Sequence, residues 1–587
     1  MKQFFKFMLA SCLGMALLLV ILSIIMIVRI GSATKNTVKV KPQTVLYMNL
    51  DYEIPERTTE DDFTAALMGF QDLNIDMSGL NDIIANIDYA KNDPDISGIF
   101  LELSQVGTST ANIEELRHHI ASFRESGKFV ITYSETMAQN AYYLATAGDE
   151  IYINPDGMLD IHGMASQIMF YKNLLDKLDI EIQIIRGPNN KFKSAVEPYF
   201  LDKMSDANRE QMTKLLNSMW YQVVSDINVS RGISIQRINE LADNLALTFD
   251  AKVALEEHFV DGLFYRDQII ARIKELAGID NSKKINILTN AQYASVRPAP
   301  KAKANKIAVI YANGQIIDGD GDNNTIGSIT LSKAIREARE NKKVKAIVMR
   351  VNSPGGSALA SEVIRREVEL AKAEKPFIIS MGSYAASGGY WISSEGDYIF
   401  ADPTTLTGSI GVFGTFPNAK KFMNEKLGLT FDVVKTNENA DFGSMVEPLT
   451  PYQLAMLQKY VGNTYNDFTA LVARTRGLRQ SYVDSIGQGR VWTGADALEL
   501  GLVDEMGGLD KAILYAAKVA NLTDYSIKDY PKQESFMDML LKGNIQEPYT
   551  NALIKNKLGK NYRYIETVEN ISRLDGVQAL MPFMIVE

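Results

Sequence analysis

The strongest constraint on the fold is an internal repeat. Residues 129–152 align with residues 377–400 without a gap, and both segments run from Phe through an alanine-rich stretch to a Gly-Asp pair. Further segments align in the same order, namely 97–103 with 345–351 and 192–198 with 442–448. Because a duplicated sequence folds into similar units, we expect two domains of the same architecture.

Each copy alternates two kinds of hydrophobic pattern. Ile307–Tyr311 and Ala346–Val351 are β-branched runs that predict buried strands. Leu331–Ala338 and Glu362–Ala371 carry apolar residues at helical spacing. Such alternation predicts an α/β fold in which most strands are parallel.

A proline-rich, charged linker separates the two copies. At 587 residues the chain also exceeds what one hydrophobic core usually organises. The predicted division is a membrane anchor with its linker at 1–44, a first repeat at 45–295, the linker at 296–305, a second repeat at 306–525, and a C-terminal extension docked on the body at 526–587.

The amino terminus predicts a membrane anchor. Phe7–Val28 contains no charged residue and, at about 1.5 Å per residue, is long enough to cross a bilayer core. The run exceeds the apolar region of a signal peptide, which favours a retained, single-pass helix. Basic residues flank both ends, so charge leaves the orientation open. The only cysteine, Cys12, lies inside this run, and the chain therefore forms no internal disulfide.

Composition argues against several function classes. The net charge is −10 and no strongly basic stretch stands out, so we expect no nucleic-acid partner. The four histidines lack the spacing of metal ligands. Asp318–Asp322 suggests calcium, but it lacks the later glycine and glutamate of an EF-hand and is interpreted as a solvated loop. We therefore expect neither a metal nor a cofactor.

Ser387 is the candidate nucleophile. It follows the predicted strand Pro376–Ser380 and precedes Gly388, Gly389 and an apolar helix start. A hydroxyl on such a turn is exposed beside helix N–H groups, which favour a developing negative charge. The alternative is that these small residues only let a helix pack closely on a sheet.

The differences between the copies point to Lys193. Gln139–Ala141 stands opposite Ser387–Gly389, and Gly443 stands opposite Lys193. The hypothesis is that two ancestral sites have been reduced to one, which uses Ser387 with Lys193. A lysine acts as a base only when burial or a nearby positive charge lowers its pKa. The alternative is an ordinary surface lysine.

The turn Arg350–Ser357 could supply oxyanion donors. Its Gly355 and Gly356 could meet the Gly388 N–H around a developing oxyanion. The matching first-copy turn lacks the double glycine. The alternative is an ordinary Ser-Pro-Gly-Gly turn.

Taken as an ordered set, these motifs resemble the S49 serine peptidases, in their long, tandem-domain signal peptide peptidase form. The motifs are VNSPGG at 351–356, MGSYAASGGY at 381–390, LTGSIGV at 406–412 and KSAVEP at 193–198. The resemblance implies a ClpP/crotonase-like fold and a Ser–Lys dyad, with Ser387 as nucleophile and Lys193 as general base. It implies that Ser409 holds the lysine amine and that the oxyanion hole contains Gly388, Gly355 and Gly356.

The resemblance also implies a setting for the enzyme. It implies a homo-oligomer, a tetramer, anchored in the bacterial inner membrane with the catalytic body in the periplasm. The implied substrates are cleaved signal peptides and other hydrophobic peptides. Two alternatives stay open: a crotonase-like enzyme that handles acyl-CoA without a nucleophile, and a non-catalytic membrane scaffold.

Overall fold

The computed structural model describes residues 38–58, 78–299, 301–533, 576–582 and 585–586, together with 14–15 and 17–18. The predicted anchor, Phe7–Val28, lies outside the described residues apart from those last four positions. Among the helices of the described part, none combines the length and the apolar character that crossing a bilayer requires.

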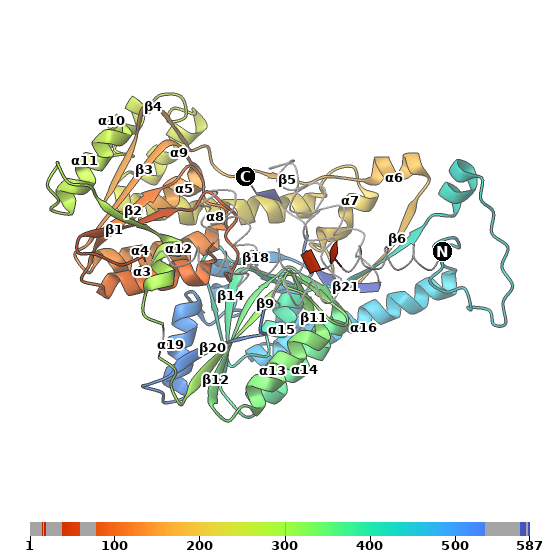
Figure 1. Cartoon of the computed structure of the whole chain (residues 1–587). Coiled ribbons are helices and arrows are strands. Elements are labelled where there is room, and N and C mark those ends of the chain that lie inside the picture. Colours follow the sequence, from red (N-terminus) through yellow and green to blue (C-terminus); the bar gives the residue numbers. More distant parts are fainter. Residues whose placement is uncertain are drawn as a thin grey trace, which may run out of the picture.

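The first repeat is built on a six-stranded parallel sheet with strand order β7-β4-β3-β2-β1-β8 (Figure 1). Side chains of β2 alternate between its faces: Ile99 and Leu101 pack into one core, and Phe100 into another that includes helix α11. Alternation with apolar residues on both sides is typical of a sheet covered on both faces. The strands are β1 (Thr44–Asn49), β2 (Ile96–Glu102), β3 (Phe129–Ala138), β4 (Glu150–Asp160), β7 (Gly262–Leu263) and β8 (Asn286–Thr289). The helices are α3 (Leu80–Asn92), α4 (Thr110–Arg124), α5 (Gln139–Ala145), α6 (Lys172–Leu178), α7 (Glu197–Phe200), α8 (Asp206–Arg231), α9 (Ile235–Asp243), α10 (Ala251–Glu256), α11 (Arg266–Leu276) and α12 (Asn290–Val296).

The second repeat has the same plan. Its sheet follows the order β18-β16-β14-β12-β9-β20, with β15 and β19 off this path, and only the β16–β18 pairing is antiparallel. The strands are β9 (Lys306–Asn313), β12 (Val344–Ser353), β14 (Phe377–Ala386), β15 (Tyr398–Ala401), β16 (Leu406–Gly408), β18 (Val491–Thr493), β19 (Glu505–Met506) and β20 (Ser526–Tyr530). The helices are α13 (Ser328–Glu340), α14 (Ala358–Lys372), α15 (Gly388–Ser393), α16 (Pro451–Arg476), α17 (Gln480–Ile486), α18 (Gly494–Glu499) and α19 (Leu509–Val519).

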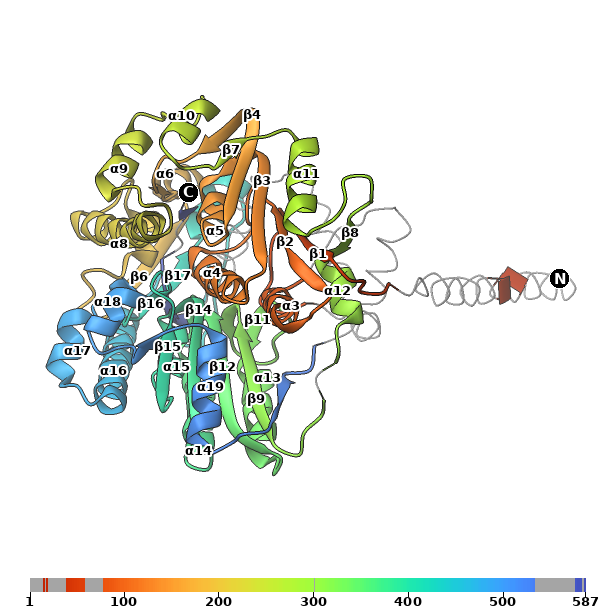
Figure 2. The same ribbon diagram turned by 90° about the vertical axis from the view of Figure 1, so that its left-hand side faces the viewer.

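The predicted mixed α/β class is confirmed. The β-branched runs expected as strands lie within β9 and β12, and the helical patterns lie within α13 and α14. The aligned segments 129–152 and 377–400 each form a strand, a short helix and a second strand, namely β3-α5-β4 and β14-α15-β15. Figure 2 shows the two sheets stacked, with that of the first repeat above that of the second.

A third sheet joins the repeats, with strand order β11-β10-β13-β21-β17-β6. In it β6 from the first repeat pairs antiparallel with β17 from the second, and β21 from the C-terminal extension lies between β17 and β13. This pairing brings the chain that follows β6, including Lys193, beside the second repeat. The strands are β6 (Glu181–Arg186), β10 (Gln315–Ile317), β11 (Thr325–Gly327), β13 (Gly355–Ser357), β17 (Phe413–Asn418) and β21 (Gly576–Leu580).

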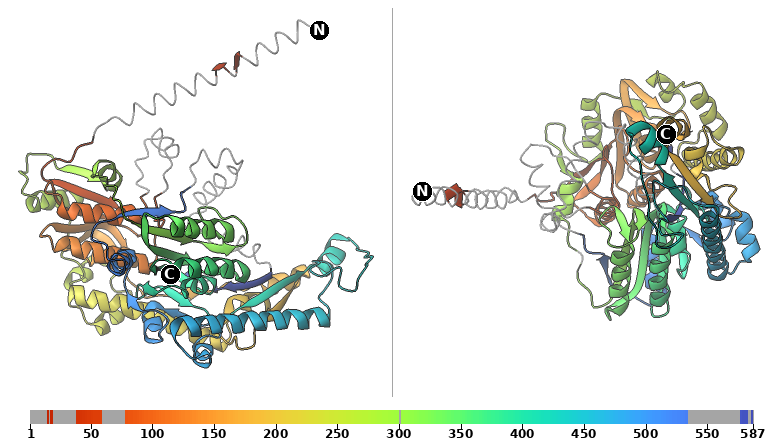
Figure 3. Two further views of the ribbon diagram at one scale, coloured as in Figure 1. Left: turned by 90° about the horizontal axis from the view of Figure 1, so that it is seen from below. Right: turned by 90° about the vertical axis from the view of Figure 1, so that its right-hand side faces the viewer.

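Two 26-residue helices, α8 and α16, occupy corresponding places in the repeats. Each begins at a hydroxyl cap, Ser205 or Thr450, and each ends at a glycine in the left-handed region, Gly232 or Gly477. Figure 3 shows α16 running along the body toward the projecting segment that precedes it.

A buried ion network fixes the repeats against each other. Arg350 on β12 is 1% exposed, and its guanidinium lies 3.0 Å from the Glu56 carboxylate and 2.8 Å from that of Glu115, both in the first repeat. Next to it, Glu114 accepts a hydrogen bond from the Thr404 N–H, and burial raises the pKa of Glu114 to about 8. Removing one partner of such a buried pair leaves an uncompensated charge.

Candidate active site

Ser387 lies on a sharp turn between β14 and α15. Its φ of 55° and ψ of −113° are rare for a residue with a side chain, and such strain collects at functional sites. The Ser387 N–H donates to the Gly408 carbonyl, which fixes the turn on β16. A Cβ on Gly389 would stand 2.6 Å from the Ser353 carbonyl oxygen. The small residues after Ser387 therefore let α15 pack closely on the sheet, and they also place the hydroxyl on the turn.

Lys193 enters this turn from the other repeat. It follows β6 and precedes the short helices η1 (Ser194–Val196) and α7 (Glu197–Phe200), and it is 1% exposed. The Phe192 N–H donates to the Gln488 carbonyl, which ties the lysine segment to the second repeat. The lysine thus reaches the serine because β6 pairs with β17.

The Lys193 amine and the Ser387 hydroxyl are in hydrogen-bond contact. Nζ lies 2.7 Å from Ser387 Oγ, and it also donates to the carbonyl and hydroxyl oxygens of Ser409, at 3.0 Å and 2.9 Å. All three residues are buried, so the expectation that the Ser387 hydroxyl is exposed on its turn is wrong. A nucleophile touching a base that a third group orients is the arrangement expected for covalent catalysis.

Burial lowers the pKa of Lys193 well below its usual value. Among the described residues, no carboxylate forms an ion pair with this amine. No carboxylate of the described residues therefore offsets the loss of hydration, and the neutral amine is favoured. A neutral amine can accept a proton from a hydroxyl.

A cradle formed by the 487–490 loop holds Lys193 against Ser409. The Ser409 N–H donates to the Arg490 carbonyl, and the Gly489 N–H donates to the Ile410 carbonyl. Gly489 has a φ of +81°, and a Cβ there would stand 2.4 Å from the Lys193 Cβ. Glycine is required at this position for both reasons.

Gln211 on α8 ties the cradle to the lysine segment. Its Nε2 donates to the Phe192 carbonyl and the Ser194 hydroxyl, and its Oε1 accepts from the Val491 N–H. Sequence reasoning missed both Gln211 and Gly489. The only available signal was the closely spaced glycine pair Gly487 and Gly489, and nothing in the sequence marks Gln211.

The three glycines expected at an oxyanion hole differ in their surroundings. The Gly388 nitrogen lies 2.6 Å from where a Cβ on Gly355 would stand, so these two residues are adjacent. The Gly355 N–H donates to the Ser353 hydroxyl, and Gly356 pairs with Ile316 of β10 on one side and Ala579 of β21 on the other. Of the three, Gly388 opens helix α15 directly behind Ser387.

The first-repeat turn that corresponds to Ser387 is filled by amide side chains. Gln139 Oε1 accepts from the His162 and Gly163 N–H groups, and Asn140 bonds the backbone of Val106 through both its amide atoms. The counterpart of Lys193, Gly443, lies in an exposed turn with nothing within 4 Å of a Cβ. Of the two pairs of positions that correspond between the repeats, only Ser387 and Lys193 thus form a Ser–Lys contact among the described residues.

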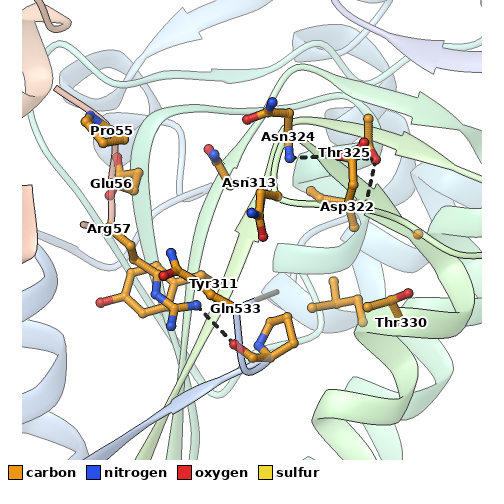
Figure 4. Close-up of a pocket in the computed structure, with 15 residues that line it drawn as sticks. Pro55, Glu56, Arg57, Tyr311, Asn313, Asp322, Asn324, Thr325, Thr330 and Gln533 are labelled. Atoms are coloured by element: carbon orange, nitrogen blue, oxygen red, sulfur yellow. Dashed lines mark hydrogen bonds between the residues drawn. The ribbon is translucent and has the colours of Figure 1, made fainter. Parts of the chain in front are cut away.

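The Asp-rich loop uses its carboxylates within the chain. Asp322 Oδ1 accepts from the Asn324 N–H and the Thr325 hydroxyl at the edge of a pocket of about 120 Å³ (Figure 4). Asp318 accepts from the Ser357 hydroxyl. Throughout the part of the chain that the structure describes, no group of three or more His, Cys, Asp or Glu is placed to hold a metal ion.

Comparisons with known proteins give the family. The sequence model of Peptidase family S49 matches twice, at residues 122–280 and 369–523, once in each repeat. Protease 4 of Salmonella typhi is 37% identical over 483 residues, which cover 81% of this chain and 77% of that protein. Protease 4 of Haemophilus influenzae is 34% identical over 530 residues, which cover 87% and 85%.

A plant protein is also similar. The chloroplastic serine protease SPPA of Arabidopsis thaliana is 31% identical over 439 residues, which cover 73% of this chain and 64% of that protein. The resemblance predicted from the motifs is thereby confirmed. The chain belongs to peptidase family S49 and is a serine peptidase.

Proposed function

We propose that this serine peptidase is an endopeptidase with a Ser387–Lys193 dyad. The observation that carries the proposal is the 2.7 Å contact between Lys193 Nζ and Ser387 Oγ inside a buried site. Membership in a serine peptidase family favours this function over an acyl-CoA-handling enzyme or a scaffold.

The reaction is acyl transfer to Ser387. Neutral Lys193 takes the hydroxyl proton while Oγ attacks the peptide carbonyl carbon. The N–H groups of Gly388 and Gly356 stabilise the oxyanion, because the Gly355 N–H already donates to the Ser353 hydroxyl. The resulting ammonium donates to both oxygens of Ser409. Lys193 then protonates the leaving amine, and water, activated by the same lysine, releases the acyl group from Ser387.

The substrates in this proposal are hydrophobic peptides bound as extended strands, such as cleaved signal peptides. Two apolar clusters flank the dyad. One contains Ala195 and Val196, next to Lys193, and the other contains Ala386, next to Ser387. Apolar walls on both sides of the reacting atoms suit large apolar side chains.

The cellular setting is part of the same proposal. The uncharged run Phe7–Val28 would anchor the chain by a single pass in the bacterial inner membrane, with the catalytic body in the periplasm. The ClpP/crotonase-like fold type and the homo-oligomeric, tetrameric state are proposed from the family resemblance.

The test is cleavage of a fluorogenic hydrophobic peptide by the detergent-solubilised full chain. Ser387→Ala and Lys193→Ala are each expected to abolish cleavage, while a serine-reactive peptide inhibitor labels the unaltered chain. Full activity in Lys193→Ala would exclude the dyad. Activity that survives Ser387→Ala would exclude the serine as nucleophile.

A further inference from the structure

The C-terminal strand β21 lies along the candidate active site. It pairs antiparallel with β13 on one side, where Gly355 faces Leu580 and Gly356 faces Ala579. On its other side it pairs antiparallel with β17, where Phe413 faces Gln578. The Met581 N–H adds a bond to the Pro354 carbonyl. A peptide that adds a strand to a sheet makes the same set of main-chain contacts.

The Ala579 carbonyl oxygen faces the glycines proposed for the oxyanion hole. It is the atom nearest to a Cβ built on Gly355, at 2.1 Å, and it lies 3.1 Å from one built on Gly388. The Ala579 carbonyl therefore lies beside the two glycines at which the proposed reaction would place a scissile carbonyl. The absence of side chains on both glycines is what lets the strand approach so closely.

Leu580 and Met581, the two residues that follow Ala579, each belong to one of the two apolar clusters beside the dyad. Leu580 packs with Ala195, Val196, Tyr199 and Phe413, and Met581 packs with Leu215, Met219, Ala386, Leu406 and Val491. Both side chains are buried. One chain segment therefore contacts the lysine side of the site through Leu580 and the serine side through Met581.

The end of the chain continues into the first repeat. Strand β22 (Ile585–Val586) pairs antiparallel with β5 (Ser166–Gln167). The C-terminal segment is thus paired both with β13 and β17 in the third sheet and with a strand of the first repeat. A peptide substrate held by both repeats would follow the same line.

We propose that residues 576–581 are an intramolecular ligand of the peptide-binding groove and withdraw before a substrate enters. The inference deepens the proposed function and rests on it. It defines the preferred ligand as an extended peptide in which a small residue faces Gly355 and Gly388 and two large apolar residues follow. Ala579, Leu580 and Met581 are that sequence in this chain.

A tethered ligand competes with a free substrate at high effective concentration. Short tethers give values on the order of 1 mM, so a segment with an intrinsic dissociation constant on the order of 0.1 mM reduces apparent substrate affinity roughly tenfold. Locking the segment in place would abolish cleavage. Dislodging it would raise kcat/KM about tenfold.

The first experiment locks the strand with a disulfide. Ser357 and Gln578 are directly opposite in the β13–β21 pair, a separation that a disulfide can span. In full chains carrying Cys12→Ser, the combination of Ser357→Cys and Gln578→Cys is expected to lose cleavage on oxidation and regain it on reduction. Each single cysteine variant serves as a control and should not respond to the redox change. Failure of the bond to form, or unchanged cleavage with the bond in place, would overturn the proposal.

The second experiment measures binding without catalysis. A labelled peptide with the sequence of residues 576–583 is titrated against the full Ser387→Ala chain and against the same chain with Leu580→Asp and Met581→Asp. The expected result is binding about tenfold tighter to the chain with the displaced segment. A peptide with Trp in place of the Ala579 equivalent should bind weakly. As a control in the protein, Ile527→Asp at an exposed position of β20 should leave the affinity for the peptide unchanged.

These outcomes separate the inference from the proposed function. Equal binding to both chains, or binding to neither, would overturn the claim that the segment covers the groove. Tighter binding to the chain with Leu580→Asp and Met581→Asp would support the claim that the segment covers the groove. If the chain that retains Ser387 also cleaves no peptide, the Ser387–Lys193 endopeptidase would be refuted.

Discussion

Replacing Ser409 with alanine isolates one contact of the Lys193 amine. The substitution removes the Oγ that lies 2.9 Å from Nζ and keeps the Ser409 carbonyl at 3.0 Å. Ser409 has a φ of 48°, and alanine retains its Cβ, so the backbone strain is unchanged. The amine becomes charged when it takes the serine proton, and a hydrogen bond to a charged group contributes about 1.5–3 kcal/mol. We therefore expect kcat/KM to fall about 10- to 150-fold.

The same substitution should move the pH profile. Burial already lowers the pKa of Lys193, and the neutral amine is the active base, so activity rises as pH increases through that pKa. Losing the Ser409 hydroxyl as an acceptor destabilises the Lys193 ammonium and lowers the pKa of Lys193 further. The rise of activity with pH therefore shifts to lower pH. The assay is kcat/KM for a fluorogenic hydrophobic peptide from pH 5 to 10. The control is Ser383→Ala. Ser383 lies on the same strand, β14, as the approach to Ser387, and its hydroxyl donates to the Ser109 hydroxyl instead of contacting Lys193. Unaltered kcat/KM and an unmoved profile in Ser409→Ala would refute the reasoning.

Three further predictions concern the cradle and the buried ions. Gly489→Ala places a Cβ 2.4 Å from that of Lys193 and should lower kcat by about 100-fold, while Gly428→Ala, with a φ of +68° but open space, should leave it unaltered. Arg350→Met should reduce the free energy of unfolding in urea by about 3–5 kcal/mol, and an effect as small as that of Arg366→Met at an exposed ion pair would contradict the network's role. Burial raises the pKa of Glu114 from 4.5 to about 8, so the protonated carboxyl contributes up to about 5 kcal/mol to the free energy of unfolding. This contribution is fully present below pH 4.5 and is lost as pH rises toward 8. Glu114→Gln should flatten that dependence in urea unfolding, and an identical slope in both proteins would be the contrary result.

Much of the fold was predictable because its signals are local. The internal repeat and the period of the apolar residues predicted paired α/β units, and β9, β12, α13 and α14 form at the expected positions. The third sheet was not predictable. Its strands come from both repeats and the C-terminal extension. Short strands such as β13 are too brief for their hydrophobic pattern to indicate which strand they pair with.

The candidate site divides in the same way. Ser387 and Lys193 could be selected because the copies differ at those two positions, and the structure places their reactive atoms 2.7 Å apart. Gly489 and Gln211 act through contacts between distant segments, which no spacing along the chain encodes. The position of Ala579 beside Gly355 depends on the fold of the whole chain. The catalytic roles of the predicted residues, the anchor and the division into domains stay predictions.

The most direct test of the dyad is the rate at which a serine-reactive peptide inhibitor modifies Ser387 in the detergent-solubilised full chain. Mass spectrometry of the modified peptide identifies the serine, and the rate is compared between the unaltered chain and Lys193→Met, which keeps a side chain of similar length without the amine. We expect modification at Ser387 in the unaltered chain and none in Lys193→Met. Modification of Lys193→Met at the unaltered rate, or of a different serine in the unaltered chain, would contradict the claim that this amine activates this hydroxyl.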